Sequence, residues 1–213
     1  MSEVSVSILD CDFNNLNSEI EKVNNTNINY IHIDIMDGVF VDRNTKKLFD
    51  LDKISNLTDK NLDIHLMIEN PLDSIDEYIN INPYLISFHI ENNDKILKCI
   101  NKIKSKGINV GIAINPNTDL NLLKPYLKYI DLVLVMSVFP GKGGQKFIDS
   151  TYERIQKLNY LKDDYDIKIS VDGGVNNSNS KKLLELGSDI LVSGSFLIKN
   201  SNILTAYKSL LNH

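Results

Sequence analysis

Short apolar runs alternate with longer amphipathic stretches eight times along the chain, and no break in composition separates the repeats. Each run has the length of a buried strand, and the stretches carry the apolar spacing and capping residues of helices. Strict alternation of this kind predicts a parallel sheet whose right-handed crossovers place the helices outside it. The expected strands span residues 4–9, 30–36, 62–68, 84–90, 108–114, 131–137, 167–173 and 189–194.

Eight strand–helix units in 213 residues favour a closed (β/α)8 TIM barrel over an open doubly wound sheet. The length is near the lower limit for that fold, so the loops must be short, and we expect one domain over residues 1–213. A helix is expected after every strand. The helix after the fourth strand is expected over residues 93–107, the one after the fifth over 119–127, and the last over 202–211.

The bulk properties exclude several classes of protein. A net charge of -5 and a pI near 5.4 argue against a nucleic-acid binder, which needs a basic face. No run approaches the roughly 18 apolar residues of a membrane span, and the first ten residues lack the features of a signal peptide. Cys11 and Cys99 are too few for a disulfide framework and are interpreted as buried free thiols. We therefore expect a cytoplasmic protein with no membrane or nucleic-acid partner.

The stretch IHIDIMDG, residues 31–38, places polar side chains on one face of an apolar strand. Strand residues of a closed barrel alternate between its interior and the helical layer. The isoleucines of this strand then face the helices, and the residues between them face inward near its carboxyl end, where barrel enzymes build their sites. The same parity turns a wider set inward: Ser5, Ser7, Leu9, His32, Asp34, Met36, His65, Met67, Met136, Ser170 and Asp172.

Four of these inward side chains suit a divalent metal: His32, Asp34, His65 and Asp172. Taken singly, each has a structural alternative, such as a hydrogen-bonded interior histidine or a turn residue that ends a strand. Their joint occurrence with matching parity at one end of a barrel favours a metal site. Two imidazoles and two carboxylates suit Zn²⁺ or Fe²⁺ best, with Mn²⁺ and Co²⁺ as alternatives.

Glycine-rich turns follow the last three expected strands: PGKGGQ at 140–145, DGGV at 172–175 and SGS at 193–195. Such turns let backbone N–H groups approach an anion closely. Barrels often bind phosphate among the loops after strands 7 and 8. Three such turns on adjacent strands therefore predict a phosphorylated ligand.

The segments HIDIMDG, HLMIENP, MSVFPGKGGQKF, SVDGGV and LVSGS, in this order and spacing, resemble those of the ribulose-phosphate 3-epimerase family. The resemblance runs from SILDCDF, at residues 7–13, to the last strand. It implies the same four metal ligands and an acid–base pair made of Asp34 and Asp172. It further implies substrate contacts by Ser7, His65, Met36, Met67, Met136 and Asp172, and phosphate binding by Gly141, Lys142, Gly143, Gly144, Gly173, Gly174, Gly194 and Ser195.

The activity that this resemblance implies interconverts D-ribulose 5-phosphate and D-xylulose 5-phosphate at C3, a reaction of the pentose phosphate pathway. Two bases would transfer the proton through a metal-stabilised 2,3-enediolate. The resemblance also implies a homo-oligomer, since homodimers and larger assemblies both occur in the family. A hexulose-6-phosphate 3-epimerase acting on allulose 6-phosphate, or a non-catalytic barrel that binds phosphosugars, remains the alternative.

Two loops depart from the family pattern. After MDG the chain reads VFVDRNTKKLFD, with Asp42 where a proline is expected, and Lys142 stands where an aromatic or apolar residue is usual. Lys142 either contacts the substrate or is a solvated loop lysine. His89 and Glu91, in FHIEN, either orient a ligand or form a structural hydrogen bond.

Overall fold

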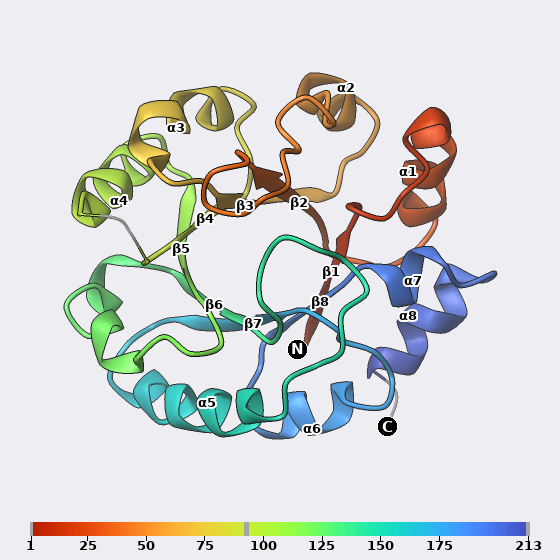
Figure 1. Cartoon of the computed structure of the whole chain (residues 1–213). Coiled ribbons are helices and arrows are strands. Elements are labelled where there is room, and N and C mark those ends of the chain that lie inside the picture. The colour runs from red at the N-terminus through yellow and green to blue at the C-terminus, as the bar shows by residue number, and fades with distance from the viewer. Residues whose placement is uncertain (1, 92–93, 212–213) are drawn as a thin grey trace.

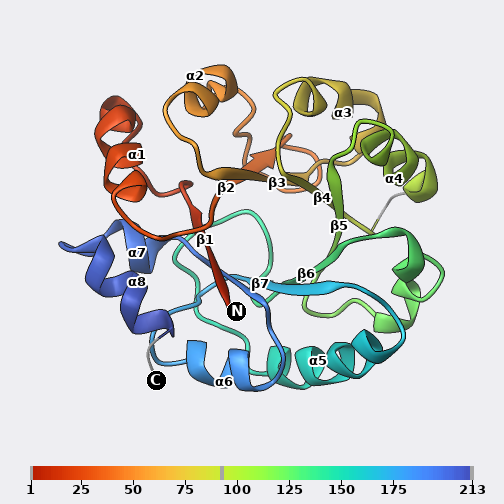
Figure 2. The same cartoon turned by 180° about the vertical axis from the view of Figure 1, so that it is seen from behind.

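The computed structural model describes residues 2–91 and 94–211. Eight parallel strands close into one barrel in chain order, and β8 pairs with β1 to complete the ring. The helices surround the strands, as Figure 1 shows and as Figure 2 shows from behind. The predicted single-domain (β/α)8 barrel is confirmed.

The strands are β1 (Glu3–Ser7), β2 (Tyr30–Met36), β3 (Asn61–Met67), β4 (Leu85–His89), β5 (Asn109–Ile114), β6 (Leu132–Met136), β7 (Lys168–Asp172) and β8 (Ile190–Ser193). The α-helices are α1 (Leu16–Asn24), α2 (Leu51–Asn56), α3 (Pro71–Ile79), α4 (Ile96–Lys104), α5 (Ser150–Asn159), α6 (Ser180–Glu185), α7 (Ser195–Ile198) and α8 (Ile203–Leu211). Four short 3-10 helices are η1 (Phe13–Asn15), η2 (Leu120–Leu123), η3 (Leu127–Tyr129) and η4 (Tyr160–Asp163).

The α-helix expected over residues 119–127 is wrong. Two 3-10 helices, η2 and η3, stand in its place. Pro125 lies between them; it has no N–H to donate, and its ring would clash with the carbonyl four residues earlier in an α-helix. After β8 the chain forms α7 before the expected last helix, α8. The expected start of the fourth helix, Asn93, lies outside the described residues.

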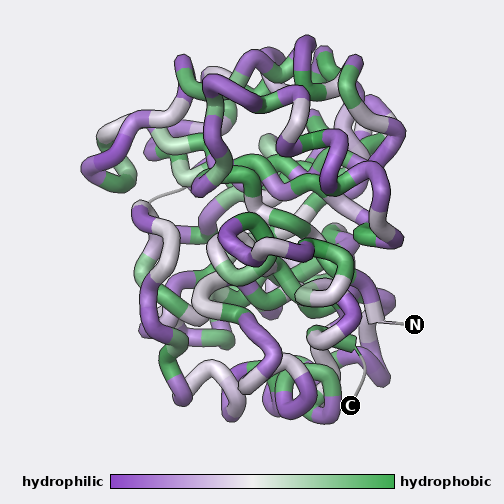
Figure 3. The backbone as a smooth tube through the Cα atoms, turned by 90° about the vertical axis from the view of Figure 1, so that its right-hand side faces the viewer, coloured by the Kyte–Doolittle hydropathy of each residue, from purple (hydrophilic) through white to green (hydrophobic). Residues whose placement is uncertain are grey.

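Two apolar layers hold the barrel together. Outward-facing strand residues such as Ile33 and Ile64 are fully buried against the helices, as the parity predicted. In Figure 3 the hydrophobic segments concentrate along the strands at the centre, and polar segments occupy the outer turns. A second, smaller cluster fills the interior and comes mainly from β6, β8 and their neighbours: Tyr30, Leu85, Ala113, Leu132, Leu134, Met136, Val138, Ile190 and Val192.

Within the described ranges, none of the helices has the length and apolarity that a membrane span requires. Cys11 and Cys99 are both buried thiols. Burial raises the pKa of Cys11 to about 12, so its reactive thiolate is scarce near neutral pH.

Ile64→Ala tests whether Ile64 faces the helical layer, as the alternation along β3 predicts. The substitution should lower the free energy of unfolding by about 2–5 kcal/mol, because it leaves a cavity between strand and helix. Leu122→Ala, at a side chain that is 54% exposed, is the control and should change stability by less than about 0.5 kcal/mol. Urea unfolding measures both values. Equal effects of the two substitutions would contradict the assignment of Ile64 to the buried face.

Candidate active site

Four polar side chains meet at the carboxyl ends of three strands. His32 and Asp34 come from β2, His65 pairs in register with Asp34 from β3, and Asp172 ends β7. One ligand atom from each residue lies within 4.8 Å of the others. Both histidines have no solvent exposure, and Asp34 is 4% exposed. These are the four residues that the sequence analysis grouped as metal ligands.

One nitrogen from each histidine faces both carboxylates of this cluster. His65 Nδ1 lies 3.2 Å and His32 Nε2 lies 3.4 Å from the same carboxylate oxygen, Asp34 Oδ1. Both nitrogens lie 3.8 Å from Asp172 Oδ2. Within the part of the chain that the structure describes, the buried His32 Nε2 has no hydrogen-bond partner. A buried orphan nitrogen beside two carboxylates fits a divalent cation, which would bind all four side chains.

The negative charges around His32 favour a bound cation or proton in this cluster. Burial works against protonation of His32, but the negative charges of Asp63 and Asp34 outweigh it and raise the pKa of His32 well above its ordinary value. A proton on His32 is one way to meet this demand. A divalent cation meets it with two charges and uses the imidazole as a ligand.

The two carboxyl groups differ in proton affinity although they are neighbours. Burial opposes ionisation of Asp34, but the positive charge of His32 and the hydrogen bond of His65 hold the pKa of Asp34 well below its usual range. Burial and the negative charge of Asp34 raise the pKa of Asp172 to about 7. Pairs whose surroundings separate their pKa values in this way are typical of acid–base catalysis.

Asp63, on β3, is a site residue that the sequence analysis missed. Its Oδ2 lies 2.7 Å from His32 Nδ1 and accepts a 3.0 Å hydrogen bond from the Ser5 hydroxyl. The carboxylate therefore keeps the ring proton of His32 on Nδ1 and leaves Nε2 free as a ligand. The available signal was parity: Asp63 lies two residues before His65, so it faces into the barrel as well.

A cavity of about 700 Å³ opens above the four-residue cluster. His32 and His65 are fully buried and are not among its lining residues. The Ser7 hydroxyl donates a 2.7 Å hydrogen bond to Asp34 Oδ2 at the base of the cavity. The other predicted site residues all line the cavity: Ser7, Asp34, Met36, Met67, Met136, Gly141, Lys142, Gly143, Gly144, Asp172, Gly173, Gly174, Gly194 and Ser195.

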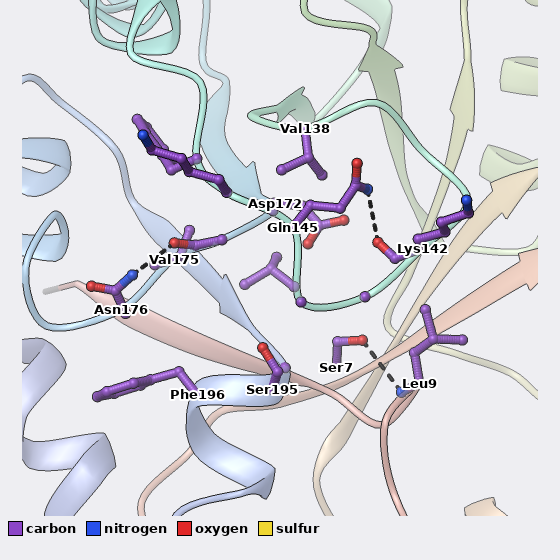
Figure 4. Close-up of a pocket in the computed structure, with 18 of the residues that line it drawn as sticks. Ser7, Leu9, Val138, Lys142, Gln145, Asp172, Val175, Asn176, Ser195 and Phe196 are labelled. Carbon is purple, nitrogen blue, oxygen red and sulfur yellow. Dashed lines mark hydrogen bonds between the residues drawn. The ribbon is translucent and has the colours of Figure 1, made fainter.

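The glycine-rich turns after β6, β7 and β8 form one side of this cavity (Figure 4). Gly174 has a φ of +62°, and a Cβ there would lie 2.8 Å from the backbone atoms Gln145 O and Phe147 N. Only glycine therefore lets the turns after β6 and β7 pack this closely. Asn176, whose amide donates 3.0 Å to the Gly174 carbonyl, also lines the cavity and was missed.

The unusual loop after β2 is anchored at both ends. The Thr45 hydroxyl donates to the Asp34 carbonyl and accepts from the Met36 N–H, at 2.7 and 2.9 Å. The Asp37 carboxylate accepts backbone N–H groups from its own turn and from the loop after β3. Asp42, in place of the expected proline, is exposed. This departure from the family pattern therefore leaves the strand end that carries Asp34 in place.

Lys142 is exposed on the loop that crosses the barrel opening after β6. Its carbonyl accepts a 2.9 Å hydrogen bond from the Gln145 side chain, which stiffens the turn. In Figure 4 the Lys142 side chain points away from Asn176 and Ser195.

Comparison with known proteins agrees with this geometry. Residues 3–198 match the model of the Ribulose-phosphate 3 epimerase family. The chain is 38% identical to a ribulose-phosphate 3-epimerase of Helicobacter pylori, covering 99% of this chain and 97% of that protein. It is 37% identical to the Bacillus subtilis ribulose-phosphate 3-epimerase, covering 95% and 94%.

A solved structure shares the fold at much lower identity. The 3-hexulose-6-phosphate synthase of Salmonella typhimurium superposes with a TM-score of 0.74 at 15% identity, covering 98% of this chain and 96% of that one. This likeness supports the barrel alone. The family match and the identity over nearly the whole length show that the chain is an enzyme of the ribulose-phosphate 3-epimerase family.

Proposed function

We propose that the protein interconverts D-ribulose 5-phosphate and D-xylulose 5-phosphate by epimerisation at C3, the reaction that the names of its relatives indicate. The supporting observation is the pair Asp34 and Asp172, whose oxygens adjoin at the floor of a cavity large enough for a sugar phosphate. In a cell this reaction would belong to the pentose phosphate pathway.

Epimerisation removes the C3 proton from one face of the substrate and returns a proton to the other face. Asp34 on β2 and Asp172 on β7 come from strands separated by β1 and β8, so they approach the substrate from different sides. One carboxylate takes the proton, a 2,3-enediolate forms, and the other carboxyl group supplies a proton to the opposite face. The roles reverse in the reverse reaction.

The Ser7 hydroxyl, through its hydrogen bond to Asp34 Oδ2, orients this carboxylate toward the substrate. Met36, Met67 and Met136 cover the reacting carbons and exclude water from them. A divalent metal held by His32, Asp34, His65 and Asp172 would act as a Lewis acid that stabilises the negative charge on the substrate oxygens. Zn²⁺ and Fe²⁺ are the preferred candidates for this donor set.

The glycine-rich turns and Ser195 would bind the phosphate group through backbone N–H groups and the serine hydroxyl. Because the phosphate lies far from C3, its binding mainly positions the reacting carbon over the two carboxyl groups. We further expect a homo-oligomer, which light scattering on the purified protein would check.

Gly174→Ala tests this phosphate site. We expect the KM for ribulose 5-phosphate to rise about tenfold, equivalent to about 1.4 kcal/mol of binding, because the added Cβ pushes the two turns apart. Gly107→Ala is a matched control: Gly107 also has a positive φ, +73°, but a Cβ there meets nothing within 4 Å. It should cost stability without changing KM. Similar KM values for both variants would contradict the assignment.

The proposed reaction is tested with purified protein supplied with Zn²⁺ or Fe²⁺. We expect turnover of ribulose 5-phosphate, and incorporation of solvent deuterium at C3. Allulose 6-phosphate, tested in parallel, distinguishes a pentulose from a hexulose epimerase by the larger kcat/KM. A metal-loaded sample that epimerises neither sugar and exchanges no C3 proton would overturn the proposal and favour a binding protein.

A further inference from the structure

A buried chain of hydrogen bonds runs outward from His65 through β4. His65 Nε2 lies 3.0 Å from His89 Nε2, and His89 Nδ1 lies 2.9 Å from Glu91 Oε2. The two imidazole rings are stacked, with centroids 5.1 Å apart. His65 is fully buried and His89 is 2% exposed, so water does not compete for these nitrogens.

Glu91 is held in one orientation by donors on its other oxygen. Oε1 accepts the Asn115 N–H at 2.8 Å and the Thr118 hydroxyl. The Arg154 guanidinium, from α5, donates to the carbonyls of both residues and holds this turn in place. Oε1 is therefore occupied by two donors, and Oε2 is left to accept from His89.

The donor and acceptor in each of these hydrogen bonds follow from the number of ring hydrogens that His65 and His89 carry. Three contacts lie in line: Asp34 with His65 Nδ1, His65 Nε2 with His89 Nε2, and His89 Nδ1 with Glu91. A neutral imidazole carries one N–H, and a ring nitrogen that binds a metal carries none. Two hydrogens serve three contacts. One of the three contacts therefore has no hydrogen. At the contact between Asp34 and His65 Nδ1, a metal ion bound to both residues can replace that hydrogen.

We propose that His89 and Glu91 are positioning residues that fix the direction of this chain. Glu91 accepts from His89 Nδ1, so His89 Nε2 is the acceptor for His65 Nε2–H, and His65 presents an unprotonated Nδ1 to a divalent metal. This role rests on the metal site of the proposed function and assigns residues outside that site. Asp63 fixes the ring hydrogen of His32 by direct contact with its Nδ1. The carboxylate of Glu91 acts on His65 indirectly, through the imidazole of His89.

The half-buried Phe40 ring also contacts this chain of hydrogen bonds. It packs on His89 with centroids 4.7 Å apart, and it belongs to the loop after β2. The positioning chain thus joins β3, β4, the loop after β2 and, through Arg154, helix α5.

Glu91→Gln is expected to exchange donor and acceptor in each hydrogen bond from residue 91 to His65. The two donors at Oε1 require the amide oxygen there, so the amide NH₂ replaces Oε2 and donates to His89 Nδ1. The hydrogen of His89 then moves to Nε2, and that of His65 moves to Nδ1, where it blocks the metal. We expect the Kd for Zn²⁺, measured by competition with a chelator, to rise 10–100-fold. Glu153→Gln, the same chemical change at a glutamate whose side chain is 69% exposed, is the control and should stay within threefold of the wild type.

The ring hydrogens are read directly by two-bond ¹H–¹⁵N NMR, which the chain's four histidines make tractable. In the Zn²⁺-loaded wild type we expect His89 to carry its hydrogen on Nδ1; in metal-free Glu91→Gln we expect it on Nε2. A wild-type His89 protonated on Nε2 would overturn the role, whether or not the variant folds. So would an unchanged Kd in Glu91→Gln. Failure of the wild type to bind Zn²⁺ at all would instead overturn the proposed metal site.

Discussion

Asp172→Asn is expected to lower kcat for epimerisation about 10³-fold while Zn²⁺ still binds. The amide keeps an oxygen for the metal but cannot take up or release a proton at catalytic rates. Asp34 remains able to act on one face of the substrate. One of the two epimers should therefore still exchange its C3 hydrogen with D₂O, whereas conversion into the other epimer stops. Coupled assays and proton NMR in D₂O measure the two rates separately.

Asp10→Asn is the matched control, because Asp10 also lines the cavity and the chemical change is the same. Its carboxylate lies 3.5 Å from the Lys199 ammonium and is not part of the four-residue cluster. We expect kcat within tenfold of the wild type. If Asp172→Asn also stays within tenfold, Asp172 is not the second acid–base group.

Removal of the metal is expected to abolish turnover and to lower the melting temperature by about 10 °C. A metal present at 1,000 times its Kd stabilises the folded state by about 4 kcal/mol. For a domain of this size each kcal/mol corresponds to about 2–4 °C. Among the residues that the structure describes, none offers His32 Nε2 a hydrogen bond, and in the metal-free protein the charges of Asp34 and Asp172 oppose each other. Differential scanning calorimetry before and after chelation, and after Zn²⁺ is restored, measures the change.

His32→Ala provides the control for the chelator itself. This variant lacks one of the four ligands, so chelation should shift its melting temperature by much less than that of the wild type. An equal shift in both proteins would mean that the chelator acts elsewhere. A wild type that keeps its activity after complete metal removal would contradict the metal site.

The barrel could be predicted from the sequence because its signals are local and periodic. The eight apolar runs recur with helices between them, and parallel strands linked in that way have few other solutions. Period-2 alternation also assigned Ile33 to the helical layer and Asp34 to the interior, and the structure confirms both burials. The error at residues 119–127 has an equally local cause, because Pro125 was present in the expected helix.

The hydrogen-bond partners of the four-residue cluster could not be predicted in the same way. Asp63 on β3 contacts His32 on the neighbouring strand β2, and Glu91 accepts a hydrogen bond from Thr118, which is 27 residues away in the sequence. Parity states which way a side chain faces but not which atom it contacts. Barrel register and the turn after β5 decide those contacts, and both are set by packing of the whole ring.

The amino-acid sequence by itself determined the barrel, the inward face of each strand and the group of four polar residues. These depend on the hydrophobic period within each segment and on the order of the segments, and both can be read along the sequence without knowledge of any contact. Only the tertiary structure decided that His32 Nε2 has no hydrogen-bond partner among the described residues, that a cavity opens at the cluster, and that His65, His89 and Glu91 contact one another in line. A hydrogen bond requires two atoms within about 3 Å, and closure of the barrel is what brings residues far apart in the chain to that distance.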